Sequence, residues 1–177
     1  MSDIGHLNGV QPMMHGMVAE ITIREFQPGD ENAFRRLNEE WIVELFALEA
    51  KDEEALANPR GNILHRGGRI FLAFAGDEAV GCCALLTEHQ FEVAKMAVTR
   101  SWQRAGIGRK LLQAVIDAAR AMGAGRLFLE TNHVMTPAIR LYESLGFRHI
   151  AHVPSPYVRS DVSMELDLKE PFRDSVV

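Results

Sequence analysis

Gln103-Arg104-Ala105-Gly106-Ile107-Gly108 decides how the sequence is interpreted, because it joins an apolar strand-like run, FEVAKMAV (91–98), to an amphipathic helical pattern, IGRKLLQAVIDAARAMG (107–123). Two glycines one residue apart let the backbone turn tightly and keep side chains away from a ligand. The unpaired amides of the first helical turn and the helix dipole both favour an anion at this place. The junction therefore predicts a cradle for a phosphate or pyrophosphate, with a plain tight turn as the alternative.

Two common phosphate-binding patterns do not fit this junction. A dinucleotide fingerprint would need a third glycine three residues after Gly108, and a P-loop would need a Ser or Thr after Lys110. Leu111 stands at both positions. The segment instead resembles the pyrophosphate loop of the GNAT superfamily of acyl-CoA-dependent N-acyltransferases, which has Gln or Arg, two residues, Gly, one residue, then Gly or Ala.

A second block supports the same resemblance. Within TPAIRLYESLGF (136–147), the residues that match the family's later helix and its Gly-Phe exit are Ala138, Tyr142, Gly146 and Phe147. The two blocks have the order and separation of the family, and the pattern of elements fits from Ile21 to Leu168. The resemblance implies an α/β fold of the α+β type, the GNAT fold, in which a mixed, mostly antiparallel sheet of about seven strands carries helices on both faces.

The periodicity along the chain agrees with this fold. Alternating or continuous apolar runs predict strands at 20–26, 69–75, 80–88, 91–99, 126–131, 148–153 and 161–168. Apolar residues at three- and four-residue steps predict a first helix after an Asp30 N-cap, with Phe34, Leu37, Trp41, Leu45 and Leu48 on one face. Further helices are expected to start near Asp52 and end before Pro59, to follow Gly106, and to run from a Thr136 cap to Leu145.

A chain of 177 residues with 47% apolar and 24% charged residues suits one globular domain. We expect a mobile leader at 1–18, a single N-acetyltransferase domain at 19–169 and a C-terminal tail at 170–177. The net charge of −5 gives no basic surface for nucleic acid or an anionic membrane. No apolar run reaches the length of a membrane span and no signal peptide is visible. Cys82 and Cys83 are interpreted as reduced core thiols, so a cytoplasmic location is predicted; a homodimer is left open.

The resemblance implies acetyl-CoA as the co-substrate, and no metal. The pyrophosphate of acetyl-CoA would contact the backbone amides from Arg104 to Arg109, and the pantetheine arm of acetyl-CoA would run along the strand before the loop. The resulting cofactor-binding set is Met96, Ala97, Val98, Gln103, Arg104, Ala105, Gly106, Ile107, Gly108, Arg109 and Asn132. Asn132 is included because the family often has an Asn three residues before the helix alanine, where this chain has Met135.

Acyl transfer from a thioester to an amine needs a base, a stabilised oxyanion and a proton for the leaving thiolate. Tyr142 is the predicted acid, the role that the matching Tyr commonly has in the family. Glu92, eleven residues before Gln103, is the predicted base, at the spacing of the basic Glu in histone-type members. The backbone amide of Val98 is the predicted oxyanion donor. Lys95 lies on the opposite face from Glu92 in a regular strand, and a bulge would change that.

The first helices of the family usually wall the acceptor pocket, so Trp41 and Glu49 are candidate substrate contacts. The histidines, His149 and His152 among them, do not have the spacing of a metal site. The predicted function is transfer of an acetyl group from acetyl-CoA to a primary amine of a small molecule or amino acid by direct attack. A protein or peptide amine as acceptor, and a non-catalytic acyl-CoA-binding regulatory module, are the alternatives.

Overall fold

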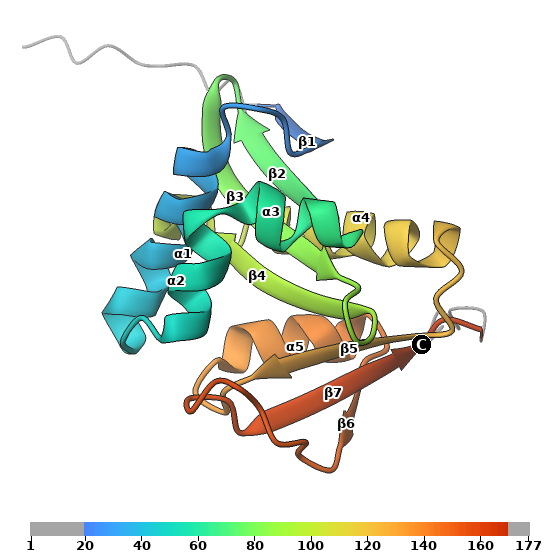
Figure 1. Cartoon of the computed structure of the whole chain (residues 1–177). Helices are drawn as coiled ribbons and strands as arrows, with labels where there is room; N and C mark the ends of the chain where they lie inside the picture. Colours follow the sequence, from blue (N-terminus) through green and yellow to red (C-terminus); the bar gives the residue numbers. More distant parts are fainter. Residues whose placement is uncertain (1–19, 170–177) are drawn as a thin grey trace, which may run out of the picture.

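The computed structural model describes residues 20–169, which form a seven-stranded sheet with helices on both faces (Figure 1). The strand order is β1-β2-β3-β4-β5-β7-β6, and every neighbouring pair is antiparallel except β4 and β5. The strands are β1 (Ile21–Glu25), β2 (Arg69–Ala75), β3 (Glu78–Leu86), β4 (Glu92–Val98), β5 (Arg126–Thr131), β6 (Arg148–Ile150) and β7 (Val162–Asp167). The expected leader at 1–18 and tail at 170–177 lie outside the described residues.

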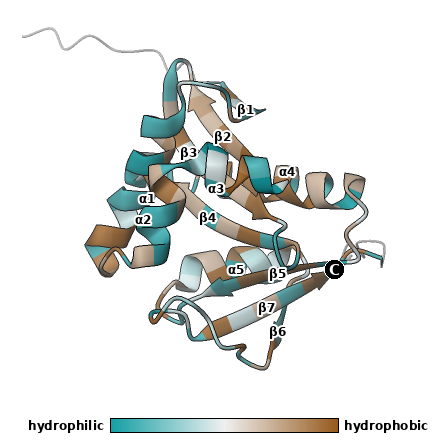
Figure 2. Ribbon diagram, viewed as in Figure 1, coloured by the Kyte–Doolittle hydropathy of each residue, from teal (hydrophilic) through white to brown (hydrophobic). Residues whose placement is uncertain are grey.

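The helices divide the core into two layers. The helices are α1 (Glu31–Leu45), α2 (Ala50–Ala57), α3 (Pro59–Asn62), α4 (Ile107–Ala121) and α5 (Thr136–Ser144), with short 3₁₀ turns at Leu64–Arg66 and Arg100–Trp102. One apolar cluster joins α4 and α5 to the sheet, and the other joins α1, α2 and the segment after α3 to the opposite face. The central strands β2 and β3 between these layers are predominantly hydrophobic (Figure 2). No helix among residues 20–169 is long and apolar enough to cross a membrane.

The strand alternation places the adjacent cysteines in different layers. Cys82 belongs to the cluster under α1, and Cys83 belongs to the cluster under α4. Both thiols are fully buried and free, and burial raises their pKa values well above the ordinary range. The prediction of reduced core thiols is confirmed, because a buried protonated thiol packs as a small apolar group.

Helix α4 follows the predicted amphipathic pattern. Ile107, Leu111, Val115 and Ala119 lie on one stripe and are buried in the core. Burial of one such branched side chain stabilises the fold by about 1.5–3 kcal/mol. The helix is bounded by two glycines in the left-handed region, Gly106 before it and Gly123 after it. The helix that carries the predicted cradle is therefore anchored by its own apolar face.

Asp30 is the N-cap residue of α1, as predicted, although its carboxylate makes no capping bond and instead accepts hydrogen bonds from Arg24 and the amide of Gln27. Two other local predictions are wrong in detail. The predicted apolar face of the first helix is too long, because α1 ends at Leu45, which is 52% exposed, and Leu48 packs on the core from the segment after the helix. Thr136 is the first residue of α5 rather than its cap.

The sixth strand is also shorter than predicted. It ends at Ile150, because the next polar groups bond to a side chain instead of the sheet ladder. The Val153 amide donates to Ser163 Oγ, and His152 Nδ1 lies 3.2 Å from the same oxygen. A loop of eleven residues, 151–161, therefore separates β6 from β7, which leaves the segment around Tyr157 free to reach across to α2.

Two irregularities in β4 create the space for the site. The parallel pairing of β4 with β5 is confined to Glu92↔Phe128 and Val93↔Leu129, so the two strands diverge beyond these residues. On its other side β4 carries a bulge: Ala94 pairs with Ala84 and Ala97 pairs with Cys82, which sets two residues of β4 against one of β3. Lys95, inside the bulge, has φ = 52°. The cleft described next lies in the opening between β4 and β5.

Candidate active site

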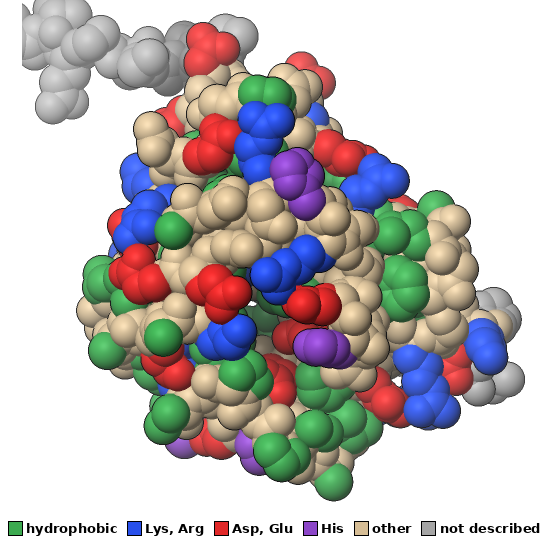
Figure 3. Space-filling model, in the orientation of Figure 1, with side chains coloured by type: hydrophobic (Ala, Val, Ile, Leu, Met, Phe, Trp, Pro, Cys, Tyr) green, Lys and Arg blue, Asp and Glu red, His purple; other side chains and the backbone are tan. Residues whose placement is uncertain are grey.

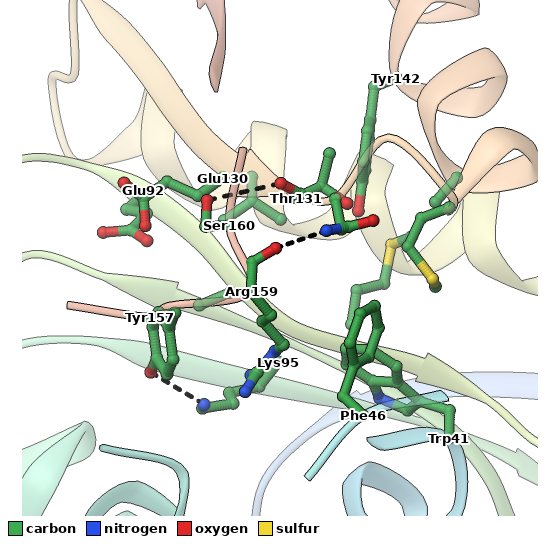
Figure 4. Close-up of a pocket in the computed structure, with 16 residues that line it drawn as sticks. Trp41, Phe46, Glu92, Lys95, Glu130, Thr131, Tyr142, Tyr157, Arg159 and Ser160 are labelled. Carbon is green, nitrogen blue, oxygen red and sulfur yellow. Dashed lines mark hydrogen bonds between the residues drawn. The ribbon is translucent and has the colours of Figure 1, made fainter. Parts of the chain in front are cut away.

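A cavity of about 110 Å³ occupies the opening between the diverging strands (Figure 4). Its walls come from five elements that are distant in the sequence: α1, β4, β5, α5 and the β6–β7 loop. The residues that bear ionisable groups or hydroxyls in these walls include Glu92, Lys95, Glu130, Tyr142, Tyr157 and Arg159. The predicted base and the predicted acid therefore line the same cavity.

Glu92 stands where β4 and β5 are still paired, at one end of the cavity. Burial, and secondly the neighbouring Glu130 carboxylate, raise the pKa of Glu92 from 4.5 to about 7, and Lys95 opposes this rise. A carboxylate with this pKa is divided between its charged and neutral forms near neutral pH, and it is a stronger base than an ordinary glutamate. The shift in pKa is thus in the direction that favours proton removal by Glu92.

Tyr142 enters the cavity from α5. Its ring is buried, packs on Phe147 with ring centroids 5.9 Å apart, and lies in the wall formed with Met135 and Ala138. Burial raises the pKa of the hydroxyl above its usual value, so the phenol holds its proton in the free protein. The protonated phenol is the form that the predicted acid requires.

The bulge in β4 brings Lys95 to the same cavity as Glu92. Lys95 Nζ lies 2.7 Å from Asp52 Oδ1 and donates a 3.0 Å hydrogen bond to the Tyr157 hydroxyl. The regular-strand arrangement, with Lys95 on the face opposite Glu92, is therefore not the one observed. The residue that sequence reasoning missed is Asp52, the fully buried carboxylate of α2 that binds this lysine.

Asp52 also binds Arg159 from the β6–β7 loop. The guanidinium makes two hydrogen bonds to the Asp52 carboxylate, of 2.6 and 2.9 Å, and a third of 3.1 Å to Glu49. These two cations hold the pKa of Asp52 at about 2 in spite of its burial. The bidentate geometry joins α2 to the loop and fixes one wall of the cavity.

Three further contacts hold the loop over the site. The Val158 amide donates to Glu49, the Ser155 hydroxyl donates to Glu130 at 2.6 Å, and the Tyr157 hydroxyl accepts from Lys95. Each contact joins the loop to a different element, respectively the α2 N-terminus, β5 and β4. The loop is therefore attached to the protein along its whole length, and it closes that side of the cavity.

The predicted substrate contacts have different positions. Trp41 lines the cavity with Phe46, and its buried indole Nε1 has no hydrogen-bond partner among residues 20–169. Glu49 belongs to a capping box at the start of α2, where its carboxylate also binds Arg159. The structure thus gives Glu49 a supporting position behind the wall and leaves Trp41 at the surface of the cavity.

The glycine loop has the backbone conformation of a cradle. Arg104 and Gly106 both adopt left-handed conformations, with φ of 65° and 76°, and Gly106 immediately precedes α4. Nothing lies within 4 Å of a Cβ built on Gly106. The amides of the first turn of α4 have no carbonyl partner inside the helix, as at any helix N-terminus, so this segment can hold an anion.

Glycine is needed at position 108 for a different physical reason than at position 106. A Cβ at Gly108 would lie 3.2 Å from Leu141 Cδ2 of α5, so this glycine allows α4 and α5 to pack closely. The side chains next to the cradle are also engaged: Gln103 donates to the Val98 carbonyl, and Arg109 donates to Ser144 Oγ. Substitution of Gly108 would therefore disturb helix packing before it disturbed a ligand.

The other predicted cofactor contacts lie on the diverging strands. Met96 and Val98 pack on the α4 side of β4, and Ala97 is buried on the α1 side. Asn132, just after β5, is held by its own surroundings: its amide donates to the Arg159 carbonyl and its oxygen accepts from the Val134 amide. All except Asn132 lie on β4 beside the opening, where an extended ligand would meet backbone.

Three histidines of the described chain, His133, His149 and His152, lie apart from one another. His133 contacts Asp161, His149 lies 3.0 Å from Glu143, and His152 lies beside Ser163. Each therefore has a separate partner, and within residues 20–169 no group of three His, Cys, Asp or Glu side chains could hold a metal ion.

A second, wider cavity of about 440 Å³ adjoins the first. Figure 3 shows a hollow ringed by acidic and basic side chains on one face of the molecule. The charged side chains that line the second cavity come from α2, the 3₁₀ turn at Leu64–Arg66, the β3–β4 connection, β4 and β5, and the β6–β7 loop adds apolar residues and Tyr157. The residues that line both cavities are Glu92, Lys95, Glu130 and Tyr157. The two spaces thus meet at the predicted base.

The sequence of this chain matches the acetyltransferase (GNAT) family over residues 23–147. The chain belongs to that family. It is 40% identical over 81 residues to the uncharacterized N-acetyltransferase YsnE of Bacillus subtilis, an alignment that covers 44% of this chain and 54% of YsnE. It is also 31% identical over 111 residues to the [ribosomal protein bS18]-alanine N-acetyltransferase of Haemophilus ducreyi, covering 60% of this chain and 76% of that protein. The chain spans little more than half the length of YsnE and 63% of YvbK, another Bacillus subtilis relative.

Solved structures share the fold. A GNAT-family acetyltransferase from Staphylococcus aureus superimposes with a TM-score of 0.77, 22% identity, and coverage of 84% of this chain and 99% of that one. The yncA protein of Salmonella typhimurium, whose structure contains acetyl-CoA, superimposes with a TM-score of 0.70, 24% identity, and coverage of 89% and 99%. The predicted fold class is therefore confirmed.

Proposed function

We propose that this protein transfers an acetyl group from acetyl-CoA to the primary amine of a small molecule by direct attack. The observation that carries the proposal is that Glu92 and Tyr142, from β4 and α5, line one cavity in the opening between β4 and β5. The family membership and the acetyl-CoA bound to yncA support the choice of acyl donor. The free buried thiols support a reducing, cytoplasmic setting.

The donor is held by backbone more than by side chains. The residues proposed to contact its pyrophosphate run from Gln103 to Arg109, with Gly106 giving the turn and the N-terminus of α4 giving the positive field. Met96, Ala97 and Val98 would accompany the pantetheine arm along β4. Asn132 becomes a weaker candidate, because both ends of its amide already have partners.

The reaction follows from the two groups in the cavity. Glu92 takes a proton from the acceptor ammonium, which leaves the nitrogen electron pair free to attack the thioester carbonyl carbon. A C–N bond forms and the C–S bond breaks, while the Val98 amide stabilises the oxyanion. The Tyr142 hydroxyl donates its proton to the leaving sulfur, and the second proton of the attacking nitrogen returns to the Tyr142 oxygen.

The closed loop supports a small acceptor. Tyr157 and Arg159 cover one side of the cavity, and their bonds to Lys95 and Asp52 would have to break before a protein chain could enter there. The wider cavity offers a separate entrance of about 440 Å³ that leads to Glu92. A space of this size suits a small amine or amino acid.

A protein amine is the second candidate, and the similarity to a ribosomal-protein alanine N-acetyltransferase favours it. A non-catalytic module would keep the cradle but not require an elevated pKa at Glu92. Screening small amines, amino acids and an alanine-ended peptide by release of free CoA thiol separates these three functions.

Glu92→Gln tests the proposal directly. The substitution keeps the shape of the side chain and removes its basicity, so turnover falls by roughly 10²–10⁴-fold, the usual contribution of a positioned base. Wild-type kcat/KM rises with pH through about 7, because Glu92 must lose its proton to act as a base. In the variant this rise moves toward the pKa of the free amine, about 10. Steady-state rates across pH 5–10 measure both changes.

Acetyl-CoA binding by calorimetry is the control, since Glu92→Gln leaves the cradle unchanged. Equal turnover in the two proteins at every pH would remove Glu92 from the mechanism. Tight acetyl-CoA binding with no acceptor-dependent thiol release in either protein would identify a binding module.

A further inference from the structure

Glu130 is the second carboxylate at the point where the two cavities meet. Glu92 pairs with Phe128 across the parallel strands, and Glu130 is two residues further along β5, so Glu92 and Glu130 lie on the same face of the sheet. Both line both cavities, and Figure 4 shows their side chains at the same end of the site. No residue motif in the sequence singles out Glu130.

The orientation of Glu130 is fixed by the loop. Ser155 Oγ donates a 2.6 Å hydrogen bond to Glu130 Oε2, and the same oxygen of Ser155 accepts from the Tyr157 amide. The carboxylate is thus held at the wall without a cation bonded to it in the described structure. A buried or half-buried carboxylate in such a place stabilises a positive charge that enters the cavity.

The cations around the pair already have partners. Lys95 and Arg159 are both bonded to Asp52, and Arg159 also binds Glu49. At the wider cavity, Lys51 pairs with Glu54 and Arg66 pairs with Glu88, while His89 and the Tyr157 hydroxyl complete the titratable groups of its wall. Among the carboxylates that line the two cavities, Glu92 and Glu130 are therefore the ones whose charge is not offset by a bonded cation within residues 20–169.

We propose that Glu130 is a positioning residue that holds the acceptor as its ammonium ion between itself and Glu92, and that it selects cationic amines without a carboxylate beside the amino group. This inference rests on the proposed function. Glu92 takes the proton from the ammonium nitrogen and becomes neutral, which removes the repulsion between the two carboxylates. Glu130 stays charged and keeps the amine in place. A carboxylate on the α-carbon of the acceptor would face Glu130 and be repelled.

The test compares phenethylamine with L-phenylalanine, two primary amines that differ by one carboxylate. Their aromatic ring suits a cavity walled by Trp41, Phe46 and Tyr157. We expect wild-type kcat/KM to be at least about tenfold higher for phenethylamine. Glu130→Gln preserves an oxygen that can accept the hydrogen bond from Ser155. In this variant kcat/KM for phenethylamine falls about tenfold, mainly because KM rises, and the ratio of kcat/KM for phenethylamine to that for L-phenylalanine becomes smaller.

A second readout does not depend on turnover. A carboxyl-carbon NMR titration follows Glu92 in the wild type and in Glu130→Gln. The pKa of Glu92 falls below about 7 in the variant, because burial still raises it but the charge of Glu130 no longer does. Glu88→Gln is the matched control. It removes a carboxylate from the wider cavity at a position paired with Arg66, so both the preference and the Glu92 titration remain as in wild type.

The outcomes separate the two proposals. An unchanged Glu92 titration, or an unchanged preference between the two amines, in Glu130→Gln overturns the role of Glu130 even if transfer is observed. Absence of transfer by the wild-type protein to any amine, with the expected change in titration, would overturn the proposed function and leave Glu130 as the neighbour that sets the charge of Glu92.

Discussion

The proposed donor side and the proposed acceptor side of this cleft are built in different ways. The donor side consists of contiguous backbone, a left-handed glycine followed by the start of α4, and its chemistry depends on conformation. The acceptor side consists of side chains from α1, α2, β4, β5 and the β6–β7 loop that are joined by ion pairs. We therefore expect donor binding to tolerate changes of side chain but not backbone strain. The acceptor side depends instead on a few buried charges.

Substitution of Asp52 is expected to have the largest effect on the acceptor side, measured as a loss of folding stability. Asp52→Asn removes the one buried carboxylate that binds both Lys95 and Arg159, and an unpaired buried charge costs about 3–5 kcal/mol. We expect the free energy of unfolding at pH 7 to fall by about this amount in urea denaturation. Glu53→Gln, on the same helix but in a half-exposed pair with Arg35, is the matched control and changes stability by less than about 1 kcal/mol.

The pH dependence of the free energy of unfolding provides a second test of the role of Asp52. The pKa of Asp52 is lowered from 3.8 to about 2, so its charge stabilises the fold above pH 4 and this stabilisation is lost as the pH falls toward 2. The difference in stability between wild type and Asp52→Asn therefore shrinks over that interval. A constant difference from pH 7 to pH 2 would contradict the assignment.

The next prediction concerns Tyr142, the proposed acid for the leaving thiolate. Tyr142→Phe removes the hydroxyl and keeps the ring packed on Phe147, so turnover falls by roughly 10²-fold, about 2.7 kcal/mol, while the melting temperature stays within error of wild type. Acetyl-CoA affinity measured alongside should hardly change. Wild-type turnover in this variant would mean that solvent or another group protonates the thiolate.

Substitution of Gly106 tests the proposed donor side, and its expected effects on stability and acetyl-CoA affinity are the smallest of these predictions. Gly106→Ala places a Cβ at φ = 76°, which costs about 1 kcal/mol, and it adds a methyl group where the pyrophosphate is proposed to lie. Gly123→Ala is a matched control at the other end of α4, since Gly123 has φ = 81° and equally open space around its Cβ. We expect both variants to lose similar stability in thermal denaturation, and Gly106→Ala alone to weaken acetyl-CoA binding, by about tenfold in calorimetry.

Equal acetyl-CoA affinity in the two glycine variants would show that the loop is only a tight turn. Gly108 is a poor choice for this experiment, because a larger residue there would press on Leu141 and change the packing of α4 against α5.

Much of the fold could be predicted because its signals are local. The stripe from Ile107 to Ala119 defines α4, and the alternation that separates Cys82 from Cys83 defines β3, since helix and strand periods are properties of consecutive residues. The glycine spacing of the loop, and the motif that contains Tyr142, are also contiguous patterns. Glu92 could be proposed by its distance from that loop.

The charged wall was decided by tertiary structure alone. Asp52, Glu130 and Arg159 carry no motif, and each is an ordinary polar residue until a bulge at Lys95, the short pairing of β4 with β5 and the early end of β6 bring them together. The strength of a charge interaction depends on distance and burial, which are set by residues far apart in the chain. The sequence by itself therefore determined the fold and the glycine loop proposed to hold the donor, and only the folded chain determined which carboxylates line the cavity.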